Sequence, residues 1–229
     1  MKYTFLLIDL DDTVFDFKKT EREALAKTIR DYGVEPTEAV LSRYHVINRW
    51  HWEQLELGKL TRQEVLENRF GVLFSELGVA ADKAACASAY SENLSVGHYW
   101  LPGAEEALQT LQGKYRLFLA SNGTASVQRR RMDSADLYRY FEDIFISQEV
   151  GDNKPAPAFF EASFARIPGF SRDKALIVGD SLTSDIRGGN NAGIATCWVN
   201  PEGKPHDPEI RVDYEIRSLA ELPDLLEKL

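Results

Sequence analysis

A chain of 229 residues, 44% hydrophobic and 28% charged, is long enough to bury one large core, or a core and a smaller second domain. This composition excludes a disordered or fibrous protein, and no apolar run approaches the length of a membrane span. The net charge of −9 argues against a nucleic acid polymer as a partner, because the chain lacks the basic surface that displaces counterions from a polyanion.

The first residues lead directly into an apolar segment without a signal-peptide pattern, so we expect a cytoplasmic protein. We also expect no membrane attachment, and no obligate protein partner is evident. Cys86 and Cys197 lie far apart and predict neither a disulfide framework nor a zinc site, so we expect two small buried side chains. Residues 129–131 are the one dense basic cluster, Arg-Arg-Arg, and on a helix we expect a solvated surface there.

The first predicted element is residues 5–8, whose four apolar residues suit a central strand of a parallel sheet. It is followed by carboxylates at Asp9, Asp11 and Asp12, and then by Thr13. Asp9 and Asp11 would point the same way on an extended chain and repel each other unless a cation lay between them. Mg²⁺ is the simplest such cation, since it prefers oxygen ligands. The plainer alternative is an acidic turn that caps the next segment.

Four helices with short connections are predicted next. Their apolar residues recur at helical spacing, glycines separate several of them, and Thr20 and Thr61 each begin a capping-box pattern. The expected ranges are 20–33, 37–57, 61–78 and 82–96. Such a block is expected to form a small bundle.

From residue 101 the pattern alternates between helix and strand. Helices are expected at 102–113, 125–132, 158–166, 183–192 and after 218, where Ser218 begins a capping pattern. Strands are expected at 115–120, 144–146, 175–178, 195–199 and 214–216, the last two at edges of the sheet. Strands separated by helices predict an α/β fold with a doubly wound parallel sheet.

The helical block separates the first strand from its sheet partners, so it is expected to be an inserted domain. We therefore expect an α/β core of residues 1–16 and 98–229, and a four-helix domain of residues 17–97.

Polar residues follow the predicted strands at four places in the chain. They are Asp9, Asp11 and Thr13; Ser121 and Asn122; Lys154; and Asp180 with Asp185. The carboxyl ends of parallel strands open on one edge of a sheet, so these groups can converge although about 170 residues separate the first from the last. Each alone has a plainer explanation, such as an ordinary turn or acids at a helix N-terminus. All four together, in this order, indicate one site.

These residues resemble the four sequence motifs of the haloacid dehalogenase-like (HAD) hydrolase superfamily over essentially the whole chain. The motifs are Asp9-x-Asp11-x-Thr13, Ser121, Lys154 and Gly179-Asp180-x4-Asp185. Position 12, commonly glycine in that family, is Asp12 here. The helical insertion resembles the family's helical cap of the first type.

A finer similarity is to the pyrimidine 5'-nucleotidase branch of that superfamily. It rests on residues 8–13, on the cap residues 46–48, Trp52, Gly58, Arg69 and Phe70, and on residues 196–198.

The resemblance implies a Mg²⁺-dependent phosphomonoesterase that works through an aspartyl-phosphate intermediate. Asp9 would be the nucleophile, and Asp11 would act first as general acid and then as general base. Asp9, the Asp11 carbonyl and Asp180 would hold the metal, and Asp185 would reach it through water or orient Lys154. Lys154 would neutralise developing charge. The phosphate oxygens would be bound by Thr13, Ser121 and Asn122.

The expected substrate is a small phosphorylated metabolite, with a pyrimidine nucleoside monophosphate favoured. Asn48, Trp52 and Arg69 are the candidates for recognising it, since a ring can stack on a base and polar groups can read its edge. The alternative is that the aromatic residues of this block belong to its core or to domain packing. His45 and His51 are expected at the surface.

Rival functions use the same motifs. A sugar-phosphate or other small-metabolite phosphatase or phosphomutase would need the same core. A 2-haloacid dehalogenase needs the nucleophile but neither a second acidic residue nor a metal, so Asp11 disfavours it. An inactive relative used only for binding is disfavoured because no catalytic carboxylate is missing.

Overall fold

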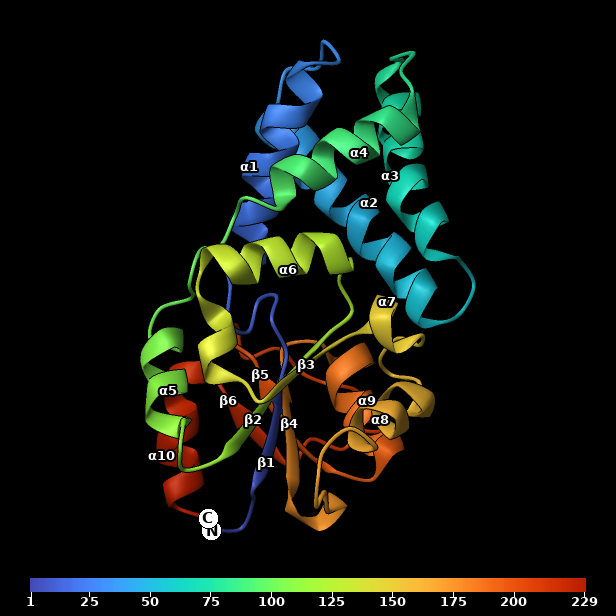
Figure 1. Cartoon of the computed structure of the whole chain (residues 1–229). Helices are drawn as coiled ribbons and strands as arrows, with labels where there is room; N and C mark the ends of the chain where they lie inside the picture. Colours follow the sequence, from blue (N-terminus) through green and yellow to red (C-terminus); the bar gives the residue numbers. More distant parts are fainter. The chain divides into compact units, whose positions relative to one another are not determined.

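The computed structural model describes all 229 residues and divides into two compact units. An α/β unit contains residues 1–17 and 98–229, and a helical unit contains residues 18–97 (Figure 1). None of the helices combines the length and the hydrophobicity that crossing a lipid bilayer requires.

The α/β unit is built on a six-stranded, all-parallel sheet with the order β3-β2-β1-β4-β5-β6. The strands are β1 (Phe5–Ile8), β2 (Arg116–Ser121), β3 (Asp143–Ile146), β4 (Ala175–Gly179), β5 (Ala195–Val199) and β6 (Tyr214–Ile216). One of the two central strands is β1, where Ile8 lies opposite Leu119 of β2 and Val178 of β4. The predicted fold class is confirmed. The expectation that β5 is an edge strand was wrong, because β5 pairs with both β4 and β6.

Six α-helices belong to the α/β unit, five of them before a later strand and the last after β6. They are α5 (Ala104–Leu111), α6 (Ala125–Ser134), α7 (Ser147–Val150), α8 (Pro157–Phe164), α9 (Arg187–Ala192) and α10 (Leu222–Glu227). A π-helical turn, Leu182–Ile186, precedes α9, and short 3-10 turns occupy Leu137–Tyr140, Arg172–Lys174 and Leu219–Glu221. The expected cap at Ser218 was wrong, since its side chain makes no capping hydrogen bond.

Alternate residues of the strands enter separate cores on the two faces of the sheet. Leu6 and Ile8 lie in the core covered by α5, α6 and α10, whereas Phe5 and Leu7 lie in the core covered by α8 and α9. Figure 1 shows α5 and α10 on one side of the sheet and α8 and α9 on the other. The unbroken apolar run of β1 is therefore explained by burial on both faces, as the sequence predicted.

The helical unit contains four helices with short connections. They are α1 (Phe17–Arg30), whose first residue belongs to the α/β unit, α2 (Glu38–Glu56), α3 (Arg62–Leu77) and α4 (Lys83–Leu94). The predicted capping box at Thr61 is confirmed, and α3 ends at Gly78, which has a positive φ of 66°. A left-handed residue at this position is a common way to terminate a helix.

The expected start of α1 at Thr20 was wrong. Thr20 is buried inside the helix, which begins three residues earlier. Asp12 contacts the start of the helix, since its Oδ1 accepts a hydrogen bond of 3.0 Å from the backbone N–H of Phe17. Asp12 has a φ of 56°, in the region that favours glycine but that aspartate tolerates better than most residues. The departure from glycine at this position therefore adds a hydrogen bond to the first N–H of α1.

Aromatic residues form much of the interior of the helical unit. Tyr44, Phe70 and Tyr90 are buried, with ring centroids 5.2–5.7 Å apart. Trp50 is 52% exposed, whereas His51 is buried and its Nδ1 bonds the carbonyl of Ile47 at 2.8 Å. The expectation that His51 is a surface residue was therefore wrong.

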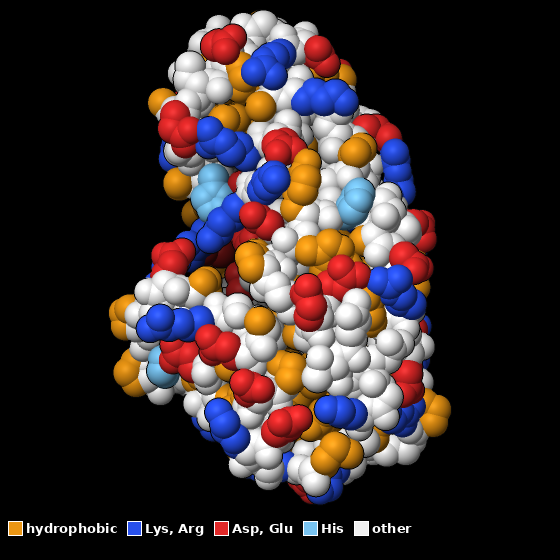
Figure 2. All heavy atoms as spheres, turned by 90° about the vertical axis from the view of Figure 1, so that its left-hand side faces the viewer, with side chains coloured by type: hydrophobic (Ala, Val, Ile, Leu, Met, Phe, Trp, Pro, Cys, Tyr) orange, Lys and Arg blue, Asp and Glu red, His pale blue; other side chains and the backbone are white.

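The surface carries charges of both signs. On the face shown in Figure 2, Lys and Arg side chains are interspersed with Asp and Glu side chains. The two cysteines are unpaired and buried, as predicted.

Candidate active site

Three carboxylates meet at the carboxyl end of the sheet. Asp9 directly follows β1, Asp180 follows β4, and Asp185 lies in the π-helical turn after it. One carboxylate oxygen of each lies within 4.8 Å of the others. The indole N–H of Trp198, on β5, donates a 2.8 Å hydrogen bond to the carbonyl of Asp180 and anchors that loop. Residues distant in the sequence thus share one small volume, as the parallel topology predicts.

Lys154 lies among these carboxylates and is only 1% exposed. Its Nζ donates three hydrogen bonds of 2.6 Å, to Asp9 Oδ1, Asp185 Oδ1 and the carbonyl of Ala120. The other oxygen of Asp185 accepts a 3.1 Å hydrogen bond from the N–H of Ser181. These contacts favour the second of the two roles considered for Asp185, which is to orient Lys154.

The electrostatics of this cluster call for a further cation. Burial raises the pKa of Asp9 to about 8, helped by Asp185 and Asp11 and opposed by Lys154. Burial and the charges of Asp9, Asp185 and Asp12 raise the pKa of Asp180 well above its ordinary value. Three carboxylates face one lysine, so the ionised cluster carries an excess of two negative charges. An oxygen-only donor set with that excess fits a hard divalent cation such as Mg²⁺.

Lys154 keeps its positive charge in this setting. Burial alone would lower its pKa, but the carboxylates of Asp185 and Asp9 outweigh burial and raise the pKa above its usual value. A buried ammonium is stable only with such partners.

The residues expected to bind phosphate have different surroundings. Ser121 ends β2, and its Oγ accepts hydrogen bonds from the N–H of Gly123 at 3.2 Å and from Gln128 at 2.9 Å. Thr13 is fully buried, and its Oγ1 has no hydrogen-bond partner. A buried hydroxyl without a partner is costly.

The side chain of Asn122 holds the backbone of Lys154. Its Nδ2 donates to the Lys154 carbonyl and its Oδ1 accepts from the Lys154 N–H, both at 2.8 Å. These bonds support a role in positioning the lysine, and the expected contact of Asn122 with phosphate stays a prediction.

Asp11 contacts two residues that the sequence reasoning missed. Arg131 Nη1 lies 2.6 Å from Asp11 Oδ1, and Gln128 Nε2 lies 2.6 Å from Asp11 Oδ2. Arg131 is completely buried, so the expectation of a solvated surface was wrong for this member of the basic cluster. Gln128 and Arg131 are three residues apart on α6 and share a face, which is the signal that would have grouped them.

Two of the three candidates for substrate recognition form hydrogen bonds with other residues of the helical unit. Asn48 Nδ2 bonds Glu21 Oε1 at 2.5 Å, and Asn48 Oδ1 accepts from Arg69 Nη1 at 2.7 Å. Asn48 and Arg69 are 4% and 2% exposed, and these bonds lie inside the helical unit, so their role in recognition stays a prediction. Trp52 stays partly exposed, with the guanidinium of Arg62 5.5 Å from its ring centroid.

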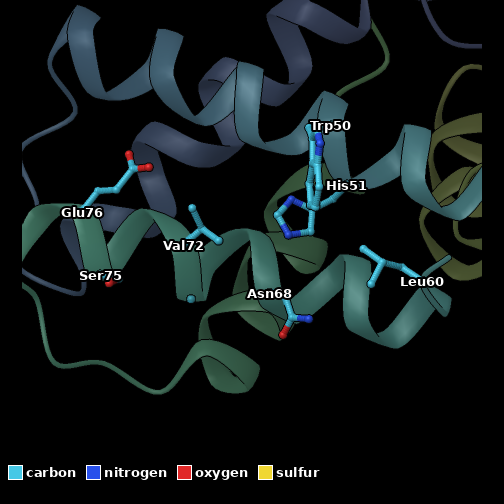
Figure 3. Close-up of a pocket in the computed structure, with 8 residues that line it drawn as sticks. Trp50, His51, Leu60, Asn68, Val72, Ser75 and Glu76 are labelled. Atoms are coloured by element: carbon cyan, nitrogen blue, oxygen red, sulfur yellow. The ribbon is translucent and has the colours of Figure 1, made fainter.

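A hollow of about 600 Å³ lies between α2 and α3 of the helical unit (Figure 3). Its lining includes Trp50, His51, Leu60, Asn68 and Val72. It contains none of the residues expected to recognise the substrate, so the sequence predicted no role for it.

Comparisons with known proteins place the chain in a family. Residues 3–193 match the model of the haloacid dehalogenase-like hydrolases. The chain is 41% identical to the HAD-hydrolase YfnB of Bacillus subtilis, over 98% of this chain and 96% of that protein. The crystal structure of YfnB bound to magnesium, which reveals interdomain movement, matches with a TM-score of 0.94 over 99% of both chains.

Two further relatives also align along nearly their whole length. The pyrimidine 5'-nucleotidase PynA of Streptococcus pneumoniae is 39% identical over 100% of this chain and 97% of its own. The pyrimidine 5'-nucleotidase YjjG of Escherichia coli is 31% identical over 99% of both. The resemblance read from the four motifs is confirmed, and the chain belongs to the haloacid dehalogenase-like hydrolase family.

Proposed function

We propose that this protein is a Mg²⁺-dependent phosphomonoesterase that hydrolyses pyrimidine nucleoside 5'-monophosphates. The observation that carries the proposal is the meeting of Asp9, Asp180, Asp185 and Lys154 at one end of the sheet, with Asp11 beside them. A nucleophile, an acid–base group and compensating positive charge are what phosphoryl transfer through an aspartyl-phosphate requires.

In the first step, an oxygen of Asp9 attacks phosphorus and forms an O–P bond while the ester P–O bond breaks. Lys154 bonds Asp9 Oδ1, which holds the carboxylate in one orientation and leaves Oδ2 for the attack. Asp11 gives its proton to the departing ester oxygen, so the nucleoside leaves as an alcohol.

In the second step, water attacks phosphorus and Asp11, now ionised, takes a proton from it. The bond between phosphorus and Asp9 breaks, which releases inorganic phosphate and restores the Asp9 carboxylate. Lys154 remains in place in both steps, because Asp185, Ala120 and the side chain of Asn122 hold its two ends. The positive charge it supplies is therefore pre-organised.

A bound Mg²⁺ would be held by Asp9, the Asp11 backbone carbonyl and Asp180, and it would supply a Lewis acid for the phosphoryl oxygens. We assign phosphate binding to Ser121 and to the unpartnered hydroxyl of Thr13.

The nucleotide assignment rests on the relatives PynA and YjjG, whose names specify pyrimidine 5'-nucleotidases. We assign residues 17–97 the role of a cap domain that recognises the leaving group, with residues 1–16 and 98–229 as the catalytic core. Trp52 is the candidate for stacking on a base, since its ring is partly exposed.

The test is phosphate release from a panel of nucleoside and sugar monophosphates in the presence of Mg²⁺. We expect dUMP, UMP and dTMP to outrank the sugar phosphates in kcat/KM. We also expect Asp9→Asn to lower that value by about a thousandfold or more, because it removes the nucleophile. Asp152→Asn, at an exposed aspartate, is the matched control and should match the wild type.

Each part of the proposal can fail separately in this assay. Faster hydrolysis of sugar phosphates would reject the nucleotide assignment and leave a small-metabolite phosphatase. A loss of less than about tenfold in Asp9→Asn would reject the nucleophile.

A further inference from the structure

We propose that Gln128 and Arg131 are positioning residues that hold the Asp11 carboxylate for its acid–base role. This inference rests on the proposed function, in which Asp11 exchanges a proton with the leaving group and with water. Neither residue belongs to the four motifs.

The geometry is a clamp with one donor on each oxygen of the carboxylate. Arg131 Nη1 bonds Asp11 Oδ1 at 2.6 Å, and Gln128 Nε2 bonds Asp11 Oδ2 at 2.6 Å. Arg131 Nη1 also bonds Gln128 Oε1 at 2.8 Å, so the two clamp residues brace each other. Donors on both oxygens fix the rotation of the carboxylate as well as its position.

The burial of Arg131 strengthens its ion pair with Asp11, because the pair is shielded from water on the arginine side. Its side chain has no exposed surface, whereas that of Asp11 is 26% exposed. Its guanidinium lies 5.4 Å and 5.8 Å from the ring centroids of Phe15 and Phe17. Removing a guanidinium from water is costly unless a charged partner compensates. Asp11 is a charged partner of this guanidinium, and its exposed part remains available to a reactant.

Gln128 connects the clamp to the candidate phosphate site. Its Nε2 also donates to Ser121 Oγ at 2.9 Å, so one amide group contacts both Asp11 and a proposed phosphate ligand. Gly123 leaves room for this side chain, because a Cβ there would lie 2.3 Å from Gln128 Nε2. The loop after β2 therefore leaves the space that the Gln128 side chain of α6 needs to reach Asp11.

The test uses two aryl esters that differ in their need for a proton, so it does not depend on nucleotide recognition. The ester oxygen of phenyl phosphate leaves readily only when it receives a proton as the P–O bond breaks. The 2,4-dinitrophenolate anion is stable, so 2,4-dinitrophenyl phosphate is cleaved without that proton. We expect Arg131→Met to lower kcat/KM by about a hundredfold for phenyl phosphate and by less than about tenfold for 2,4-dinitrophenyl phosphate. Asp11→Asn should show the same selectivity, with a larger loss.

Arg129→Met is the matched control, since Arg129 lies on the same helix and pairs with Glu149 rather than Asp11. It should leave kcat/KM for both esters at the wild-type value. Circular dichroism and the rise in melting temperature on adding Mg²⁺ should be the same in wild type and Arg131→Met. If Arg131→Met does not fold, Arg131→Lys and Gln128→Met are compared in the same way and should show the same selectivity.

Equal losses for the two esters in the folded clamp variants would overturn the positioning role. So would a loss in Arg129→Met as large as that in Arg131→Met. Failure of the wild type to cleave either ester with Mg²⁺ would instead reject the proposed function, so the two failures are distinguishable.

Discussion

The charges of Asp9, Asp180, Asp185 and Lys154 are the dominant feature of this protein at the scale of single residues. Lys154 bonds the carboxylates of Asp9 and Asp185, yet burial still raises the pKa of Asp9 and of Asp180. The site therefore stores an electrostatic cost that a divalent cation would relieve. The same cost makes the stability of the protein depend on pH.

The pKa of Asp9, raised to about 8, determines the sign of that dependence. An exposed aspartate in the unfolded chain titrates near about 3.9, so folding makes the carboxyl group hold its proton more tightly. Its contribution to stability is complete below about pH 4 and is lost as the pH rises through about 8.

We expect the metal-free protein to lose stability across this window. Mg²⁺ binds the ionised carboxylate, so it should raise the melting temperature more at about pH 8 than at about pH 6. Thermal melts with EDTA or with excess MgCl₂ measure this rise at each pH. The difference between the rise at about pH 8 and the rise at about pH 6 should shrink in Asp9→Asn. An equal rise at both pH values would contradict the link between Asp9 and the metal.

At the scale of elements, the end of β4 shows how a strand and a turn form part of the site. The last residue of β4 is Gly179, and a Cβ there would lie 2.2 Å from Asp185 Oδ2. Only glycine lets the turn that follows bring Asp185 back over the strand to Lys154. Gly71, in the middle of α3, has no such role, since a Cβ there would meet only Lys83 Cδ, at 3.4 Å.

The same substitution should therefore have opposite effects at these two glycines. Gly179→Ala should displace Asp185, lower kcat/KM by about tenfold or more and lower the free energy of unfolding by about 1–3 kcal/mol. Gly71→Ala should raise the free energy of unfolding by about 0.5–1 kcal/mol, because alanine favours the helix, and it should leave activity unchanged. Denaturant melts and steady-state kinetics measure both. Wild-type activity in Gly179→Ala would show that Asp185 does not need its position.

At the scale of the whole molecule, the sheet explains how the chain accommodates an inserted helical unit. The chain leaves the α/β unit after Phe17 and returns at His98, and the strands on either side, β1 and β2, pair with each other. The two larger apolar cores of the α/β unit are built from side chains on the two faces of the sheet, whereas the carboxylates follow the strand ends. Folding should thus depend little on the metal, whereas activity should depend on it completely.

Chelation should separate these two properties. We expect EDTA to abolish phosphatase activity without changing the far-ultraviolet circular dichroism spectrum, and excess Mg²⁺ to restore activity. The carboxylate cluster needs the cation for its charge balance, but the hydrophobic cores do not. Full activity in EDTA would contradict the metal assignment.

The sequence by itself was sufficient to predict the structure where one physical factor dominates. The four apolar residues of β1 predict a doubly covered strand, and the capping box at Thr61 predicts the start of a helix, because both patterns act locally. The meeting of Asp9, Lys154 and Asp180 also followed from the sequence, since parallel strands bring their carboxyl ends to one edge.

The tertiary structure decided which polar side chains form hydrogen bonds and ion pairs with one another. Arg131 looked like one of three similar surface arginines, and Asn48 and Arg69 looked available to a substrate. Their neighbours, Asp11 for Arg131 and Glu21 for Asn48, come from other elements of the chain. Whether a polar residue on a helix is buried depends on what packs against it, and helical periodicity carries no information about that partner.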